Sequence, residues 1–169
     1  MKLAAVEAVA RVLNEAGVPF LVVGGLAVIA HGYVRTTQDI DLVIRLEPSA
    51  IRRAFAALLT IGYRPTVPVT GEQFADVRQR EGWARDKGMT VLSFFSDHFR
   101  GVLLDVFITE PFDFEAEYAA AKVDEVASGV PVRVVRLTTL INLKRAAGRP
   151  QDLADIAELE QIEREQRDG

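Results

Sequence analysis

Two neighbouring stretches of the sequence decide its fold: VPFLVVGG at residues 18–25 and TTQDIDLVIRL at residues 36–46. The first is a short apolar run, rich in β-forming residues, that ends in two glycines, which is typical of a buried strand entering a tight turn. The second alternates, so that Asp39 and Asp41 point to one face of a strand and Ile40 to the other. Together they predict a strand, a glycine turn and a second strand that carries paired carboxylates.

Further elements follow on both sides of these stretches. Charged and apolar side chains recur at helical spacing in residues 1–17, which predicts an amphipathic helix. Residues 25–32, GLAVIAHG, are small and apolar and suit a short helix packed closely on a sheet. Later in the chain we expect a helix opened by Pro48, a helix near 72–80, an antiparallel strand pair at 89–97 and 101–110, a hairpin around Gly129, and helices at 137–148 and 150–167.

The order of these elements predicts an α/β or α+β fold, with a mixed twisted sheet, flanking helices and a helical C-terminal end. A length of 169 residues is enough for one domain with a real core and short for two. We expect residues 1–136 to form the α/β core and residues 137–169 to form a helical segment packed on it, as one compact unit.

The composition excludes several classes of protein. Hydrophobic residues make up 49% and charged residues 26% of the chain, which excludes a disordered tail, a collagen-like fibre and a coiled-coil rod. The net charge of −4 argues against a general polyanion binder, so any nucleic-acid contact must rest on a local patch. With no cysteine and two histidines, a metal site would use oxygen ligands and a hard cation.

The N-terminal sequence shows no pattern of a targeting signal. Glu7, Arg11 and Glu15 interrupt any apolar core that a signal peptide would need. The longest nearly uncharged stretch, residues 17–30, contains glycines and is shorter than a membrane span. We therefore expect a cytoplasmic protein.

A third aspartate extends the acidic pair. Asp105 interrupts the apolar strand VLLDVFI at residues 102–108, where an unpaired carboxylate would be costly. Asp39 and Asp41 lie about 6–7 Å apart along one strand face, where their like charges repel and a bound divalent cation would favour the ionised forms. Because Mg²⁺ binds carboxylates together with phosphate oxygens, the three aspartates predict a magnesium–nucleotide site.

Gly24 and Gly25 supply the complementary half of such a site. A turn from a strand through two glycines into a helix lets backbone N–H groups approach a phosphate at the positive end of the helix. A glycine pair alone is weak evidence, and so is a pair of aspartates on a strand. The combination with Asp105 is specific.

These residues resemble the signature of a known family. Gly24-Gly25, thirteen intervening residues, and Asp39-x-Asp41, with Asp105 as the third acid, resemble the polymerase-β-type nucleotidyltransferase superfamily. The longer strings GGLAVIAHGYVRTTQDIDLVI and LKRAAGRPQDLADIAEL resemble the minimal prokaryotic nucleotidyltransferases around the AbiEii toxin group. In that group a downstream lysine and a helix-borne Asp-Leu-x-Asp accompany the first motif. The resemblance covers residues 21–44, 102–109 and 137–159, and the corresponding late residues are Lys144, Asp152 and Asp155.

The resemblance implies a metal-dependent enzyme that transfers a nucleoside monophosphate from an NTP to a hydroxyl of an acceptor, which is an RNA 3′ end such as that of tRNA, a protein or a small molecule. It also implies a toxin role, with a cognate antitoxin as partner. Asp39, Asp41 and Asp105 would bind two Mg²⁺ ions, which Mn²⁺ could replace, and Asp105 would also act as general base. The nucleotide-binding residues implied in this way are Gly24, Gly25, Arg35, Thr36, Thr37, Lys144, Arg149 and Asp152.

Structural interpretations of the same residues remain open. Asp39 could cap a turn, Asp105 could be satisfied by a buried arginine, and the two glycines could serve only close packing. Asp152 falls in the first turn of the helix that begins at Pro150, where a carboxylate favours the helix dipole, and Lys144 could equally be structural. We interpret His31 as a packed residue.

Residues 51–88 contain seven basic and four acidic residues, a net charge of +3, with Phe74 and Trp83 interleaved. This region could face RNA or a nucleotide acceptor, although a solvated insertion is the favoured interpretation. For the whole chain, two alternatives to a transferase remain. One is a non-catalytic binding or antitoxin-type module on the same scaffold, and the other is a metal-dependent phosphodiesterase.

Overall fold

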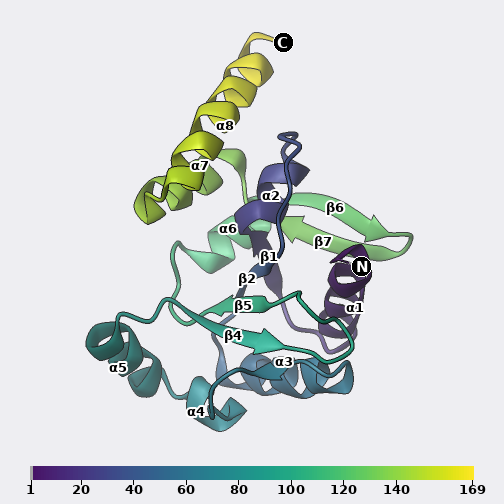
Figure 1. The fold of residues 1–169 in the computed structure, drawn as a ribbon, viewed down its shortest axis with the longest axis vertical. Helices are drawn as coiled ribbons and strands as arrows, with labels where there is room; N and C mark the ends of the chain where they lie inside the picture. The colour runs from purple at the N-terminus through teal and green to yellow at the C-terminus, as the bar shows by residue number, and fades with distance from the viewer. Residues whose placement is uncertain (1) are drawn as a thin grey trace.

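The computed structural model describes residues 2–169, which form one mixed sheet with helices around it (Figure 1). In chain order the elements are α1 (Lys2–Glu15), β1 (Phe20–Val23), α2 (Gly24–Ala30), β2 (Ile40–Ile44), α3 (Pro48–Thr60), β3 (Arg64–Pro65), α4 (Gly71–Ala75), α5 (Val77–Lys87), β4 (Val91–Phe95), β5 (Leu104–Phe107), α6 (Phe114–Ala120), β6 (Lys122–Ala127), β7 (Val130–Val134), α7 (Leu137–Ala147) and α8 (Pro150–Asp168). The predicted α/β class is confirmed.

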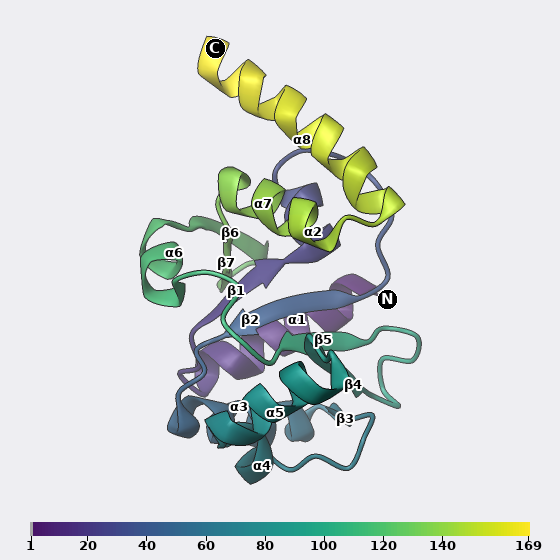
Figure 2. The same cartoon turned by 90° about the vertical axis from the view of Figure 1, so that its left-hand side faces the viewer.

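The seven strands lie in the order β3-β4-β5-β2-β1-β7-β6. β2 is antiparallel to β1 and parallel to β5, and β1 is parallel to β7, so the sheet is mixed. The helices gather at two ends of the molecule: α2, α7 and α8 at one, and α3, α4 and α5 at the other (Figure 2). The C-terminal part of α8 projects beyond the rest of the molecule (Figure 1).

The register of the central strands fixes one row of residues across the sheet. Val23 on β1 pairs with Asp41 on β2, Asp41 pairs with Asp105 on β5, and Asp105 pairs with Ser93 on β4. Residues directly opposite each other in a sheet share a face, so this row sets two carboxylates and a hydroxyl side by side. The apolar residues of β1 and β2 are buried and form the centre of the core.

Several elements differ in detail from the sequence prediction. Asp39 lies at a bend just before β2, not on the strand itself. The helix expected near residues 72–80 is two helices, because Asp76 leaves the helical conformation and its side chain caps α5. The predicted strand pair is confirmed as β4 and β5, but the link between them is longer than expected, and β3 is an additional short strand.

The C-terminal helices follow directly on the sheet. α7 ends at Gly148, whose φ of 63° is a left-handed conformation that favours glycine, and α8 begins two residues later at Pro150. This short link makes the two helices pack against each other. The boundary near residue 136 stays a prediction, although it falls between β7 and α7. Within residues 2–169, no helix has both the length and the hydrophobicity required to cross a bilayer.

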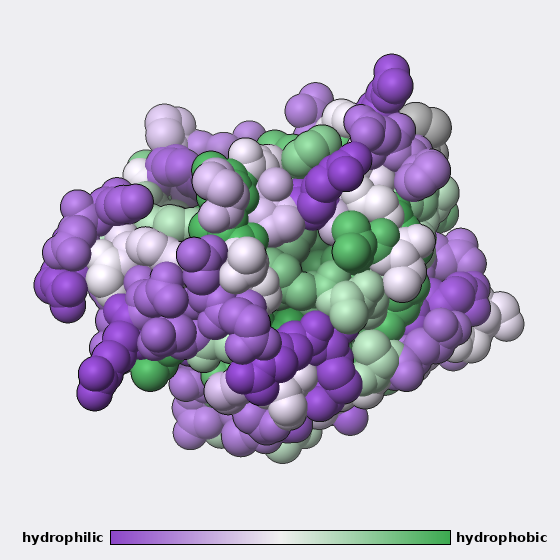
Figure 3. All heavy atoms as spheres, turned by 90° about the horizontal axis from the view of Figure 1, so that it is seen from below, coloured by the Kyte–Doolittle hydropathy of each residue, from purple (hydrophilic) through white to green (hydrophobic). Residues whose placement is uncertain are grey.

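The basic region at residues 51–88 is largely a solvated surface. Seen from below, the side of the molecule that carries α5 is strongly hydrophilic, and an apolar patch lies nearer the centre of this face (Figure 3). Arg52 pairs with Glu72, and Arg85 pairs with Asp86. Phe74 is buried and cannot stack on a base, which removes one of the two aromatic platforms that an RNA-binding interpretation would use.

Arg80 in this region is not on the surface. It is 5% exposed, its Nε donates to the carbonyl of Ile108 at 3.0 Å, and its Nη1 donates to the carbonyl of Phe74. Its guanidinium also lies 5.6 Å from the centre of the Phe74 ring. Arg80 therefore fastens α4 and α5 to the end of β5.

Arg80→Met should lower the free energy of unfolding by about 2–4 kcal/mol, because two buried backbone carbonyls lose their donor. Urea denaturation followed by circular dichroism measures the change. The matched control is Arg78→Met, an exposed position on the same helix, where we expect a change within about 0.5 kcal/mol. Equal stabilities of the two variants would contradict the structural role of Arg80.

Candidate functional site

A cleft of about 790 Å³ lies between the central strands and the C-terminal helices. Its floor carries Asp39, Asp41 and Asp105, and Gly24 and Gly25 line one side. The residues on the α7 and α8 side include Leu140, Leu143, Lys144, Arg149 and Asp152. One cleft thus contains the three aspartates, the glycine turn, and the residues Lys144, Arg149 and Asp152 of the C-terminal part. In the sequence these residues are up to 128 positions apart.

The acids come together because of strand register. Asp41 and Asp105 are cross-strand neighbours, and Asp39 reaches the same cleft from the bend before β2. Ser93, the partner of Asp105 on β4, donates its hydroxyl to Asp105 Oδ1 at 2.6 Å. Ser93 is a site residue that the sequence analysis missed. It could have been found as a polar residue in the strand 89–97, which the sequence predicts to pair with 101–110.

The electrostatics of the three acids reflect burial and mutual repulsion. Burial raises the pKa of Asp41 to about 6, and the neighbouring charges of Asp105 and Asp39 add to the effect, whereas Lys144 and Arg149 oppose it. Burial also raises the pKa of Asp105, against the hydrogen bond from Ser93. Among the described residues, no ion pair engages Asp39, Asp41 or Asp105, so a serine and not a buried arginine satisfies Asp105.

Both positions need a residue without a Cβ, because other side chains approach the backbone of Gly24 and Gly25 closely. Gly24 has a φ of 66°, and a Cβ added there would lie 2.2 Å from Asp41 Oδ2. A Cβ at Gly25 would lie 2.3 Å from Thr37 Oγ1. Gly24 therefore packs against Asp41 on β2, and Gly25 packs against Thr37 in the segment that precedes β2. They bring the start of α2 next to the Asp41 carboxylate.

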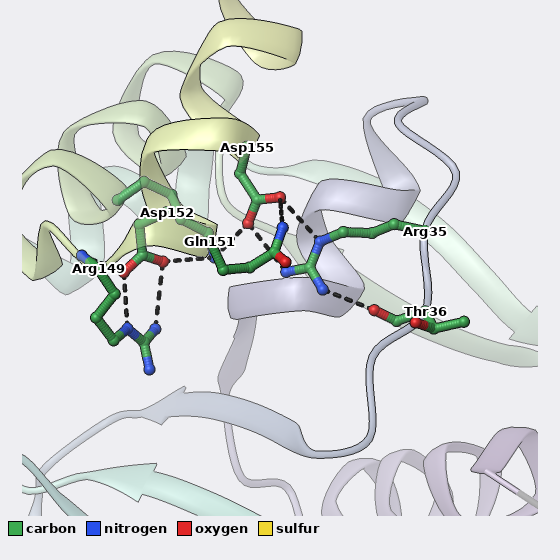
Figure 4. A network of polar contacts seen from close by, with 7 residues as sticks. Arg35, Thr36, Arg149, Gln151, Asp152 and Asp155 are labelled. Atoms are coloured by element: carbon green, nitrogen blue, oxygen red, sulfur yellow. Dashed lines mark hydrogen bonds and ion pairs between the residues drawn. The ribbon is translucent and has the colours of Figure 1, made fainter.

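A network of buried ion pairs forms the opposite wall of the cleft (Figure 4). Asp155 is fully buried, and Arg35, Lys144 and Gln151 all lie within 3.0 Å of its oxygens. Lys144 Nζ also donates to Asp152 Oδ1 at 3.1 Å. Lys144 is thus held between two carboxylates, so its position in the wall is fixed.

Asp152 is held mainly by Arg149. The Arg149 backbone N–H and its Nε donate to Asp152 Oδ2 at 3.1 and 2.7 Å, and Nη2 donates to Oδ1 at 3.2 Å. Burial opposes ionisation of Asp152, but hydrogen bonds from Arg149 and Lys144 outweigh it and lower the pKa of Asp152. The side chain of Arg149 remains 74% exposed and is the most accessible cation of the network.

The remaining predicted residues are placed as follows. Thr37 lines the cleft, whereas Thr36 is exposed and does not line it. Arg35 lines the cleft but is engaged by Asp155. His31 is a packed residue, because its Nε2 lies 2.7 Å from the carbonyl oxygen of Val135 and burial lowers its pKa.

The donor set suits a hard divalent cation. It consists of carboxylates alone, they are partly buried and repel one another, and no cationic side chain of residues 2–169 makes an ion pair with them. In the part of the chain that the structure describes, no three acidic or histidine side chains are grouped closely enough to hold an ion as they stand. The carboxylates have the chemistry that a hard metal ion needs, but they are not close enough together to bind one without moving.

Comparison with known proteins shows the fold. No protein-family model matches the sequence, and no curated protein matches it significantly. A crystal structure of ANT(2'')-Ia in complex with adenylyl-2''-tobramycin is 16% identical, with 96% of this chain and 92% of that chain covered at a TM-score of 0.56. A solution structure of the antibiotic-resistance factor ANT(2'')-Ia is 19% identical, with coverage of 95% and 81% and a TM-score of 0.57. The lincomycin-bound lincosamide antibiotic adenylyltransferase LnuA is 13% identical, with coverage of 90% and 92% and a TM-score of 0.58.

Asp41→Asn should stabilise the metal-free protein at pH 8 by about 3 kcal/mol, because it removes a charge that burial and two neighbouring carboxylates disfavour. The folded-state pKa of about 6 lies above the ordinary value of 3.8, so the penalty is small at pH 4, develops between about pH 4 and 6, and is fully present at pH 8. Thermal unfolding in EDTA at pH 4, 6 and 8 measures this. A variant that is equally or less stable than the wild type at pH 8 would contradict the electrostatic description of the floor.

Proposed function

We propose that this chain, which has a nucleotidyltransferase fold, is a metal-dependent enzyme that transfers a nucleoside monophosphate from an NTP to a hydroxyl group. One observation carries the proposal: the strand register sets Asp41 directly opposite Asp105 on the floor of the cleft, with Asp39 beside them. In a structure without a ligand this arrangement is unfavourable. It becomes favourable when positive charge and phosphate enter the cleft.

Asp39, Asp41 and Asp105 are the residues that we propose hold two Mg²⁺ ions, for which Mn²⁺ could substitute. All three would hold one ion, and Asp39 and Asp41 would hold the other. When bound, such ions lower the pKa of the acceptor hydroxyl and stabilise the pyrophosphate leaving group.

The other residues of the cleft act directly on the nucleotide and the acceptor. The backbone N–H groups at Gly24 and Gly25 would face a phosphate bound at the start of α2, and the Thr37 hydroxyl lies close to Gly25. Asp105 accepts the proton of the acceptor hydroxyl, and the Ser93 bond to Oδ1 holds this carboxylate in place. Lys144 and Arg149 contribute positive charge, and Arg149 is exposed enough to leave Asp152 for a phosphate oxygen.

We propose a small molecule as the acceptor. The ANT(2'')-Ia crystal structure contains an adenylylated tobramycin, and the LnuA structure contains lincomycin. This chain covers 92% of each of those chains, so it is similar to them in extent as well as in fold.

A second candidate is an AbiEii-like toxin that modifies tRNA or protein and is bound by a cognate antitoxin. The observation that favours it is the Lys144, Asp152 and Asp155 motif, which the structure shows as one buried network. Incubation with each labelled NTP and Mg²⁺, together with total RNA, a panel of hydroxyl-rich antibiotics or the protein alone, separates the two candidates by the product that carries the label.

In the same assay, Asp39→Asn should reduce transfer by at least about 100-fold, because the cleft loses a carboxylate that would hold both metal ions. The matched control is Asp97→Asn, an exposed aspartate that does not line the cleft, for which we expect full activity.

Three outcomes would contradict the proposal. Unchanged transfer by Asp39→Asn would remove the acids from the mechanism. Release of free nucleotide without label on any acceptor would indicate a phosphodiesterase. Absence of metal-dependent NTP binding in calorimetry would indicate a non-catalytic module.

A further inference from the structure

The segment between α2 and β2 delivers Asp39 to the cleft, yet its own backbone is held only at its ends. Residues 33–39 belong to no helix or strand. Within the described chain, their backbone bonds to other residues are Tyr33 N–H to the Val28 carbonyl at one end and the neighbouring Ile40 N–H to the Leu103 carbonyl at the other. Val34, near the middle, is 86% exposed. A segment with so few contacts depends on side chains for its position.

Arg35 supplies the contact in the middle. Its Nη2 donates to Asp155 Oδ2 at 3.0 Å, and its Nε lies 2.9 Å from Oδ1 without the geometry of a hydrogen bond, so the two-pronged ion pair consists of one hydrogen bond and one close charge contact (Figure 4). Its Nη1 donates to the Thr36 carbonyl at 2.7 Å, which fixes the adjoining backbone as well. One side chain therefore joins this segment to α8, 120 residues later in the chain.

Asp155 has no capacity left for a ligand. Oδ1 also accepts from Gln151 Nε2 at 3.0 Å, and Oδ2 also contacts Lys144 Nζ at 3.0 Å. The side chain is 0% exposed. Any effect of Asp155 on the reaction must therefore pass through Arg35 or Lys144, which makes Asp155 a positioning residue.

The position of Arg35 determines how the segment passes the glycine turn. A Cβ at Gly25 would lie 3.2 Å from Arg35 Nη2 and 2.3 Å from Thr37 Oγ1, so both side chains rest against the start of α2. Asp39 follows two residues after Thr37. A shift of Arg35 would move Thr37 and Asp39 relative to Gly24 and Gly25.

We propose that the Arg35–Asp155 pair is a clamp that positions Asp39 in the cleft, and that Arg35 serves this role instead of binding phosphate. The inference rests on the proposed function for its kinetic consequence, but the clamp itself is a property of the folded chain. It replaces the sequence-based expectation that Arg35 meets phosphate oxygens.

A double-mutant cycle tests the clamp. Arg35→Lys keeps the charge but cannot make the two-pronged contact, and Asp155→Asn keeps the shape of the side chain but removes its charge. Because misplacement of a reacting group is costly even without loss of binding, each variant should lower kcat by about 10–100-fold and change the KM for NTP by less than about 3-fold. The double variant should be no worse than Asp155→Asn alone, since both changes break the Arg35–Asp155 contact and only Asp155→Asn also disturbs the contact with Lys144.

The matched control is Arg45→Lys. Arg45 also makes a two-pronged pair, with Glu115 at 2.9 and 2.6 Å, but this pair is exposed, follows the opposite end of β2 and does not line the cleft. We expect its kcat and KM to equal those of the wild type.

Hydrogen exchange gives a readout that does not depend on activity. The two hydrogen-bonded amides that flank the segment, Tyr33 and Ile40, should exchange at least about 10-fold faster in Arg35→Lys and Asp155→Asn, while amides of β1 and β7 keep their protection. General destabilisation would accelerate exchange in the strands too. If the wild type transferred no nucleotide, the proposed function would fail, and the exchange rates alone would decide whether the clamp exists.

Three results would overturn the clamp. The first is a rise in the KM for NTP confined to Arg35→Lys, which would make Arg35 a phosphate ligand. The second is a double variant whose loss of kcat is the product of the single losses. The third is unchanged exchange of the Tyr33 and Ile40 amides in both variants.

Discussion

The repulsion between Asp41 and Asp105, set opposite each other on adjacent strands, is the constraint on which the rest of the site depends. Burial raises the pKa of both carboxyl groups. The surroundings accommodate these charges without neutralising them: Gly24 leaves room for the Asp41 carboxylate, and Ser93 donates a hydroxyl to Asp105. A fold selected for stability alone would place apolar residues in this row, as β1 does with Val23. The retained charges indicate a ligand that binds them.

The C-terminal helices and the link between them carry the positively charged residues of the cleft wall. Lys144 and Arg149 lower the pKa of Asp41 through charge alone, without contacting it. Asp152 and Asp155 hold the buried Lys144 on α7 away from the acidic floor, and Asp152 also pairs with the exposed Arg149 just before α8. The cleft therefore stays open between an acidic floor and a cationic wall, which suits a metal-bound triphosphate.

The sequence predicted those parts of the site that depend on local pattern. Alternation around Asp39 and Asp41, a carboxylate inside an apolar strand at Asp105, and the Gly24-Gly25 turn were all readable from spacing. The contacts of Arg35 with Asp155 were not, because a pair separated by 120 residues leaves no periodic signal. By sequence alone, Arg80 counts among the charges of a surface region. Its partners are backbone carbonyls, which every residue has, so no sequence pattern marks them.

The proposed function depends on Asp39, Asp41 and Asp105 binding metal together with a nucleotide. Counting bound Mn²⁺ by electron paramagnetic resonance, in the presence of a non-hydrolysable NTP analogue, tests it most directly. The account predicts about two ions per chain in the wild type and about one in Asp105→Asn, because Asp105 contributes to only one of the two proposed ions. An Mn²⁺ count that is the same in both proteins, or no binding by the wild type, would contradict it.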